Sequence, residues 1–182
     1  MGLIRIEIWI VCTLLLIAQV IQMTSCDAPA TYDFKVVKDG ISVEVYDFNH
    51  FSPRLHAKDR EIHIVNFWAT WCKPCVEELP VFEQFYQEMM DVNVRFTFVS
   101  LDFEEKIETK LIPFLQKNKL NGEVVVLKQD GMNDWINRIE PSWSGALPAT
   151  ILMHGDRKIF HSGSIDLLRL KQLFTQIQTT TL

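Results

Sequence analysis

The sequence contains no dense run of Lys or Arg that would attract a nucleic acid. Its 18 Lys and Arg residues are outnumbered by 23 Asp and Glu, so the formal net charge is −5. Because nucleic acids are bound largely through clustered positive charge, we expect no nucleic-acid partner. The sequence also shows no Gly-rich phosphate loop, no Ser/His/Asp arrangement, no internal repeat and no low-complexity stretch.

The composition excludes several structural classes. Hydrophobic residues make up 48% of the 182 residues and charged residues 23%, which is typical of a globular protein. Disordered, collagen-like and multispan membrane proteins are therefore excluded. A chain of this length fits one domain with an appendage, and it buries roughly 70% of its extended surface, enough for a core without disulfide staples.

Cysteine is scarce, and its placement is informative. Of four cysteines, Cys12 lies in an apolar run and Cys26 follows that run, which leaves Cys72 and Cys75 inside the expected domain. One close pair does not make the disulfide framework of a small secreted scaffold. The pair therefore indicates redox chemistry or metal binding.

Residues 1–26 are expected to form a targeting segment, and residues 27–182 the folded domain. The apolar run from Ile8 to Ile21 follows Arg5 and would rise about 21 Å as a helix, less than the roughly 30 Å of a bilayer core. These proportions favour a secretory signal, although a retained anchor over residues 3–23 is an alternative. Cys26 follows Thr24 and Ser25, as in a bacterial lipoprotein signal, so lipidation of Cys26, ordinary cleavage and a retained anchor all stay open.

The patterns after residue 30 predict an α/β domain with one central mixed sheet, helices on both faces and an N-terminal β-hairpin around Asp39-Gly40. Residues 47–60 read as irregular, and Ser164 is expected to cap the last helix. Strands are predicted at 34–37, 41–45, 62–68, 94–101, 123–127, 149–153 and 158–161. Helices are predicted at 73–90, 113–118, 132–139 and from residue 164 onward.

The segment Trp71-Cys72-Lys73-Pro74-Cys75 ends a predicted buried strand and begins a predicted helix. Unpaired N–H groups and the positive end of the helix dipole favour a thiolate at this point, and the thiolate is the nucleophile in disulfide exchange. We therefore expect Cys72, at the exposed start of the turn, to attack, and Cys75, one turn further, to resolve the mixed disulfide.

The stretch from Val65 to Pro80, which contains WCKPC, resembles the active site of the thioredoxin superfamily, and more narrowly the exported TlpA/ResA-type thiol–disulfide oxidoreductases. Leu147-Pro148-Ala149-Thr150 matches the late strand start that carries a cis-proline in that superfamily. The resemblance covers most of residues 31–178 and implies a thioredoxin-like fold. It also implies that Trp71, Leu147 and Pro148 border the bound substrate.

Two departures from cytoplasmic thioredoxins bear on proton transfer. Asn66 stands where those proteins carry a buried Asp, and Asn cannot take up a proton. Glu78 stands where the ResA-like subgroup places an acidic residue, which implies that it exchanges a proton with Cys75. The alternative is that Glu78 is an exposed helix acid, as its neighbour Glu77 is expected to be.

The resemblance implies an exported, membrane-tethered disulfide reductase on the periplasmic side, acting on apocytochrome c or other exported proteins. It also implies a membrane thiol-reducing electron donor, because such a reductase works in an oxidising compartment. Alternatives are a dithiol oxidase of folding proteins, a scaffold, or a copper carrier that adds His154 or His161 to the cysteines. We expect no cofactor and no metal, since a zinc site needs four ligands at closed spacing.

Overall fold

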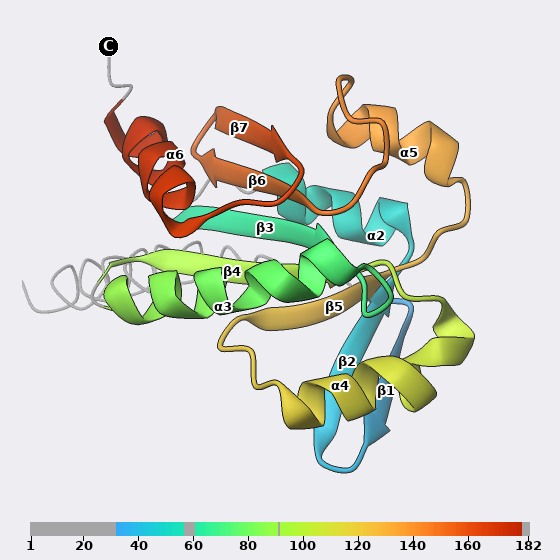
Figure 1. Ribbon diagram of the computed structural model, residues 1–182. Helices are drawn as coiled ribbons and strands as arrows, with labels where there is room; N and C mark the ends of the chain where they lie inside the picture. The colour runs from blue at the N-terminus through green and yellow to red at the C-terminus, as the bar shows by residue number, and fades with distance from the viewer. Residues whose placement is uncertain (1–31, 57–60, 91, 180–182) are drawn as a thin grey trace, which may run out of the picture.

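The computed structural model describes residues 32–56, 61–90 and 92–179, and within them the strands form one seven-stranded mixed sheet. The expected targeting segment 1–26, with Cys26, lies outside the described residues. The strand order is β1-β2-β5-β4-β3-β6-β7 (Figure 1). The strands are β1 (Phe34–Lys38), β2 (Ile41–Tyr46), β3 (Ile62–Trp68), β4 (Val94–Ser100), β5 (Glu123–Leu127), β6 (Ala149–His154) and β7 (Arg157–Ser162).

The middle of the sheet is parallel and its edges are antiparallel. β2, β5, β4 and β3 pair in parallel, whereas β1 joins β2, and β6 joins β3 and β7, in antiparallel fashion. All seven residues of β3 are buried, as its β-branched and aromatic sequence with little alternation predicts for a strand covered on both faces. The predicted hairpin is confirmed: Asp39 and Gly40 both have positive φ (51° and 79°), as the tight turns of hairpins require.

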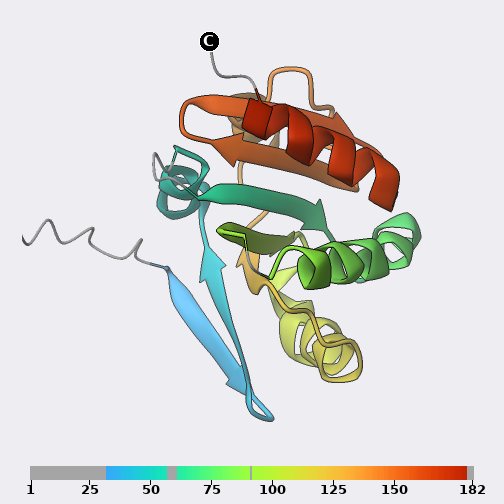
Figure 2. The same ribbon diagram turned by 90° about the vertical axis from the view of Figure 1, so that its left-hand side faces the viewer.

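Helices cover both faces of the sheet, which confirms the predicted layering. One core cluster joins the sheet to α3 (Lys73–Glu88), α4 (Ile112–Lys117) and α6 (Leu167–Thr179). The other joins it to α2 (Phe48–Phe51) and α5 (Met132–Ile139). Figure 2 shows α3, α4 and α6 on one side of the sheet and α2 on the other. Shorter turns are η2 (Ser52–His56), η3 (Glu104–Lys106) and η4 (Ile107–Leu111).

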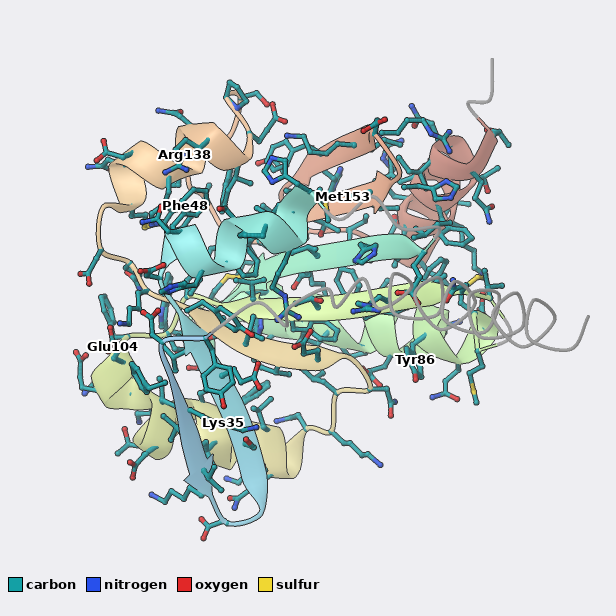
Figure 3. All side chains as sticks on the ribbon, turned by 180° about the vertical axis from the view of Figure 1, so that it is seen from behind. Lys35, Phe48, Tyr86, Glu104, Arg138 and Met153 are labelled. Carbon is teal, nitrogen blue, oxygen red and sulfur yellow. A yellow bond between two sulfur atoms is a disulfide. The ribbon has the colours of Figure 1, made fainter. Side chains whose placement is uncertain are left out.

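Two predictions about local structure were wrong. Residues 48–56, expected to be irregular, are helical, because the Asp47 side chain accepts a hydrogen bond from the His50 N–H (2.8 Å) and α2 buries Phe48. Phe48 stacks on Trp135, with ring centroids 5.7 Å apart, and its ring lies 4.5 Å from the Arg138 guanidinium (Figure 3). A cap and buried aromatic residues thus stabilise this short helix.

The second wrong prediction concerns the residue that caps α6. Asp166, rather than Ser164, accepts the hydrogen bond from the Arg169 N–H at the first turn (2.7 Å). Ser164 lies too early in the chain to cap the helix, because the helix begins only at Leu167. Its carbonyl oxygen lies 3.2 Å from the His161 ring instead.

Of the helices in the described segments, none is both long and apolar enough for a membrane span.

Candidate active site

Cys72 and Cys75 lie where the central strand passes into α3, and a disulfide joins them with 5.3 Å between their Cα atoms. Cys72 is the residue immediately before the first turn of α3, and its carbonyl accepts the Val76 N–H (3.1 Å). The expectation of an exposed Cys72 was wrong: the residue is only 6% exposed, and Cys75 is 0% exposed. Of the two cysteines, only Cys72 has any exposed surface.

Asp102, which the sequence reading missed, fixes the loop that leads to Cys72. Its buried carboxylate accepts hydrogen bonds from the Thr70 N–H (3.0 Å), the Thr70 hydroxyl (2.5 Å) and the Ser100 hydroxyl (2.7 Å). The Leu101 N–H also donates to the Trp68 carbonyl (2.8 Å). An acid two residues after a buried strand was the available signal, because a buried carboxylate needs several hydrogen-bond donors.

Glu78 is buried one turn beyond Cys75, at 3% exposure, so the alternative of an exposed helix acid is wrong. Its carboxylate accepts hydrogen bonds from the Asn66 amide (2.9 Å) and from the Ile165 N–H (2.9 Å). Burial raises the pKa of Glu78 to about 7, while these two hydrogen bonds oppose the rise. Glu77 is exposed, as expected, and lies 3.6 Å from the Lys73 ammonium.

Asn66 connects Glu78 to the neighbouring strand. It pairs with Thr150 in the register of β3 and β6, and its Nδ2 donates both to Glu78 and to the Thr150 hydroxyl (3.1 Å). Its buried Oδ1 has no hydrogen-bond partner. Asn66, which contacts the buried Glu78 through its Nδ2, thus keeps an unused hydrogen-bond acceptor in its Oδ1.

The segment before β6 forms the other wall of the site. The peptide bond between Leu147 and Pro148 is cis, as the resemblance predicts. The Trp143 indole N–H donates to the Ala146 carbonyl (2.8 Å), which fixes the segment against the sheet. Gly145 has φ 85°, a left-handed backbone conformation that favours glycine, and a Cβ there would also lie 2.6 Å from the tip of the Ile136 side chain.

The structure brings most of the predicted substrate-contacting residues together around one pocket. Trp71, Cys72 and Leu147 line a pocket of about 730 Å³, whereas Pro148 is buried and is not among the lining residues. Phe103 and Met132, which the sequence reading did not single out, also line the pocket. Their signal was weak, because Phe103 lies in the loop after β4 and Met132 is the first residue of α5, and an isolated apolar residue is common in both places.

Potential metal ligands gather elsewhere in the described residues. Asp33, Asp47 and His50 place ligand atoms within 4.8 Å of one another, and no described group of three such side chains includes Cys72 or Cys75. The Lys128 ammonium already lies 2.8 Å from the Asp33 carboxylate. A cation thus already neutralises part of this cluster.

Comparison with known proteins identifies the family. The AhpC/TSA family profile matches residues 33–162, well over half of the chain. The chain belongs to the AhpC/TSA family. Relatives of this AhpC/TSA domain include sporulation thiol-disulfide oxidoreductase A of Bacillus subtilis, 35% identical over 63 residues, and thiol-disulfide oxidoreductase ResA of Oceanobacillus iheyensis, 37% identical over 73 residues. These matches cover 35% and 37% of this chain and 38% of each relative.

Solved structures confirm the thioredoxin-like fold of the AhpC/TSA domain. A thioredoxin-family thiol:disulfide interchange protein from Chlorobium tepidum superimposes with a TM-score of 0.56 at 17% identity, covering 79% of this chain and 92% of its own. A thioredoxin-related protein from Neisseria meningitidis gives a TM-score of 0.52 at 22% identity, covering 67% and 88%. The predicted resemblance to ResA-type proteins is thus confirmed, while the roles of individual site residues stay predictions.

Proposed function

We propose that this protein is a thiol–disulfide oxidoreductase in which Cys72 is the nucleophile and Cys75 the resolving thiol. The observation that carries the proposal is the pair at the start of α3, where Cys72 alone has exposed surface. The start of a helix favours a thiolate over a thiol. Relatives named thiol-disulfide oxidoreductases support the same activity.

The proposed reaction moves two electrons from the protein to its substrate. The reduced Cys72 thiolate attacks one sulfur of a substrate disulfide, a Cys72–substrate disulfide forms, and the other substrate sulfur leaves as a thiolate. Cys75 then loses its proton and attacks Cys72 Sγ. The second substrate sulfur leaves, and the protein is left with the Cys72–Cys75 disulfide.

Glu78 is the proposed acceptor of the Cys75 proton. It lies on the same helix three residues after Cys75, a spacing that places side chains on one face. Its pKa of about 7 suits a group that takes and returns a proton near neutral pH. In the described structure, the neighbouring Asn66 can donate a hydrogen bond to the carboxylate but cannot accept its proton.

The reductive direction, the substrates and the electron source are further parts of the proposal. Resemblance to ResA-type proteins favours reduction of disulfides in apocytochrome c or other exported proteins. A membrane thiol-reducing donor would then reduce Cys72–Cys75 again after each turnover, because an oxidising compartment supplies no reducing thiols.

We also propose that the protein is exported and tethered to the membrane on its periplasmic side. The support is the apolar run of residues 8–21 and the placement of Cys26 directly after Thr24-Ser25. Two or more acyl chains on Cys26 would hold the domain at the membrane firmly, whereas one chain gives only marginal binding.

The tether is tested by the mass of the processed protein. We expect membrane-fraction protein to begin at an acylated Cys26, and a Cys26→Ser variant to lose this acylated form. An intact residue 1 would indicate a retained anchor instead. A free end at Asp27 or beyond would contradict both forms of tether.

The activity is tested with the reduced protein and a disulfide-linked peptide. We expect two peptide thiols to appear for each Cys72–Cys75 disulfide formed, with a reduction potential low enough to drive the peptide to its thiol form. A reduction potential of about −120 mV would indicate an oxidant of folding proteins. Stoichiometric copper binding without any peptide reduction would favour the copper carrier.

A further inference from the structure

The two oxygens of the buried Glu78 side chain have partners of different kinds. Oε2 accepts the Ile165 N–H (2.9 Å), and Oε1 accepts the Nδ2 of Asn66 (2.9 Å). A backbone N–H can only donate, so Oε2 has to stay an acceptor whether or not Glu78 carries a proton. When Glu78 takes up a proton, the proton therefore lies on Oε1, the oxygen that faces Asn66.

A proton on Oε1 needs an acceptor, because a buried O–H without one is costly. Beside the carboxylate, however, Asn66 places its Nδ2, whose two N–H groups donate to Glu78 and to the Thr150 hydroxyl (3.1 Å). The Asn66 Oδ1, at the other corner of the same amide, is buried and has no partner among the described residues. The acceptor that neutral Glu78 requires is thus part of Asn66, but it faces away from Oε1.

A half-rotation of the Asn66 amide exchanges these two groups. The amide nitrogen and oxygen are nearly equal in size, so the rotation needs no repacking of the buried strand β3. Oδ1 then faces Glu78 and Thr150 and accepts from both, because a hydroxyl can rotate to donate. A leucine at this position could neither donate nor accept, and an ionised aspartate could only accept.

We propose that Asn66 is a positioning residue whose side-chain amide rotates with each gain and loss of the Glu78 proton, donating to the carboxylate and accepting from the carboxylic acid. Glu78 then has a hydrogen-bond partner in both of its forms. The part that this rotation plays in turnover rests on the proposed function. There the proton that leaves Cys75 Sγ is held on Oε1 by Asn66 Oδ1, and it returns to Cys75 when the pair is reduced again.

Other titratable groups near Glu78 do not account for such a change. Burial raises the pKa of Glu78, the hydrogen bonds from Ile165 and Asn66 oppose the rise, and no charged side chain of the described residues contributes. The titratable groups on the elements around it are Cys75 and Glu77 on α3, His161 beside Thr150 on β7, and Asp166 before α6. In the oxidised protein Cys75 does not titrate, and the other three side chains are at least partly exposed.

The test follows the Asn66 side-chain amide by nuclear magnetic resonance in the oxidised full-length protein. Spectra are recorded over about two pH units on either side of the Glu78 pKa of about 7, and the Glu78 carboxyl carbon reports its protonation. Above the midpoint we expect a nuclear Overhauser contact between the Nδ2 protons and the Thr150 side chain, which lie close together in the structure. Below it we expect this contact to be lost, because Nδ2 has rotated away.

Glu78→Gln holds the protein in the rotated state. Its Oε1 has to accept the Ile165 N–H, so its Nε2 faces Asn66 and needs Oδ1 as an acceptor. We therefore expect the Overhauser contact to be absent from this variant at every pH. Glu77→Gln is the matched control, because Glu77 is exposed and paired with Lys73, and it should titrate as the parent does.

The outcomes separate this inference from the proposed function. An Overhauser contact that persists below the Glu78 midpoint, or that is present in Glu78→Gln, would overturn the inference while leaving the oxidoreductase activity in place. Failure of the reduced protein to reduce any peptide disulfide would contradict the proposed function. It would not alter the result for the amide, which is obtained without substrate.

Discussion

Replacement of Cys72 with serine is expected to reduce peptide-disulfide exchange to the rate of buffer alone. A serine hydroxyl is not ionised near neutral pH and does not attack a disulfide sulfur, so no mixed disulfide can form at this position. Cys75 cannot substitute, because it is fully buried. The measurement is the appearance of peptide thiols in a single turnover of the reduced protein.

Cys75→Ser is expected to give the complementary result. Cys72 still attacks, but the resolving thiol is missing, so the Cys72–peptide disulfide persists and adds the mass of one peptide chain to the protein. Dithiothreitol should remove this adduct, and the double variant lacking both thiols should show none. A peptide adduct at Cys75 in the Cys72→Ser variant would contradict the assignment of attacker and resolver.

The sequence was sufficient for the parts of the fold that depend on local pattern. β3 was predictable because its seven residues are apolar or β-branched almost without interruption, and it is buried throughout. The hairpin was predictable from Asp39-Gly40, a pair that tolerates positive φ. The cysteine pair was predictable from its position between a strand and a helix, strengthened by family resemblance.

The polar network behind the pair was less accessible to sequence reasoning, because its partners are distant along the chain. Glu78 contacts the Ile165 N–H across 87 residues, and Asn66 contacts Thr150 across 84 residues. These contacts depend on strand register and on the docking of α6, which no local pattern specifies. Glu78 was predicted from resemblance alone, and its burial became apparent only in the structure.

The helical turn at residues 48–56 is a different case, since its signal was present. Asp47 is a preferred cap residue, and Phe48 and Phe51 are spaced three apart, as on one face of a helix. Pro53 and the polar residues around it masked this pattern. A four-residue helix forms here because tertiary burial of both phenylalanines stabilises it.

The buried Glu78 predicts a pH-dependent stability whose sign follows from its raised pKa. Between the ordinary pKa of 4.5 and the folded pKa of about 7, the folded protein binds a proton that the unfolded chain has released. The free energy of unfolding therefore falls as pH rises through this window and levels off above it. The difference in pKa corresponds to a loss on the order of 3 kcal/mol from this group.

Glu78→Gln is expected to remove this contribution and to slow the resolving step. Glutamine stays neutral, and its Nε2 can donate to Asn66 Oδ1, which has no partner, if the Asn66 amide turns. Urea unfolding of the oxidised protein, in which Cys72 and Cys75 do not titrate, should then show a flatter dependence between pH 4.5 and 7.5 than the parent. Because glutamine cannot take the Cys75 proton, decay of the Cys72–peptide disulfide should slow by about a hundredfold.

Glu77→Gln provides the matched control for both measurements. Glu77 lies beside Glu78 on the same helix but is exposed and paired with Lys73, so Glu77→Gln removes a local negative charge without touching the buried network. We expect its pH profile and its rate of mixed-disulfide decay to match the parent within about twofold, since an exposed pair contributes little. Equal effects of the two substitutions would show that Glu78 acts only through the general surface charge, and would contradict its role as the proton acceptor of Cys75.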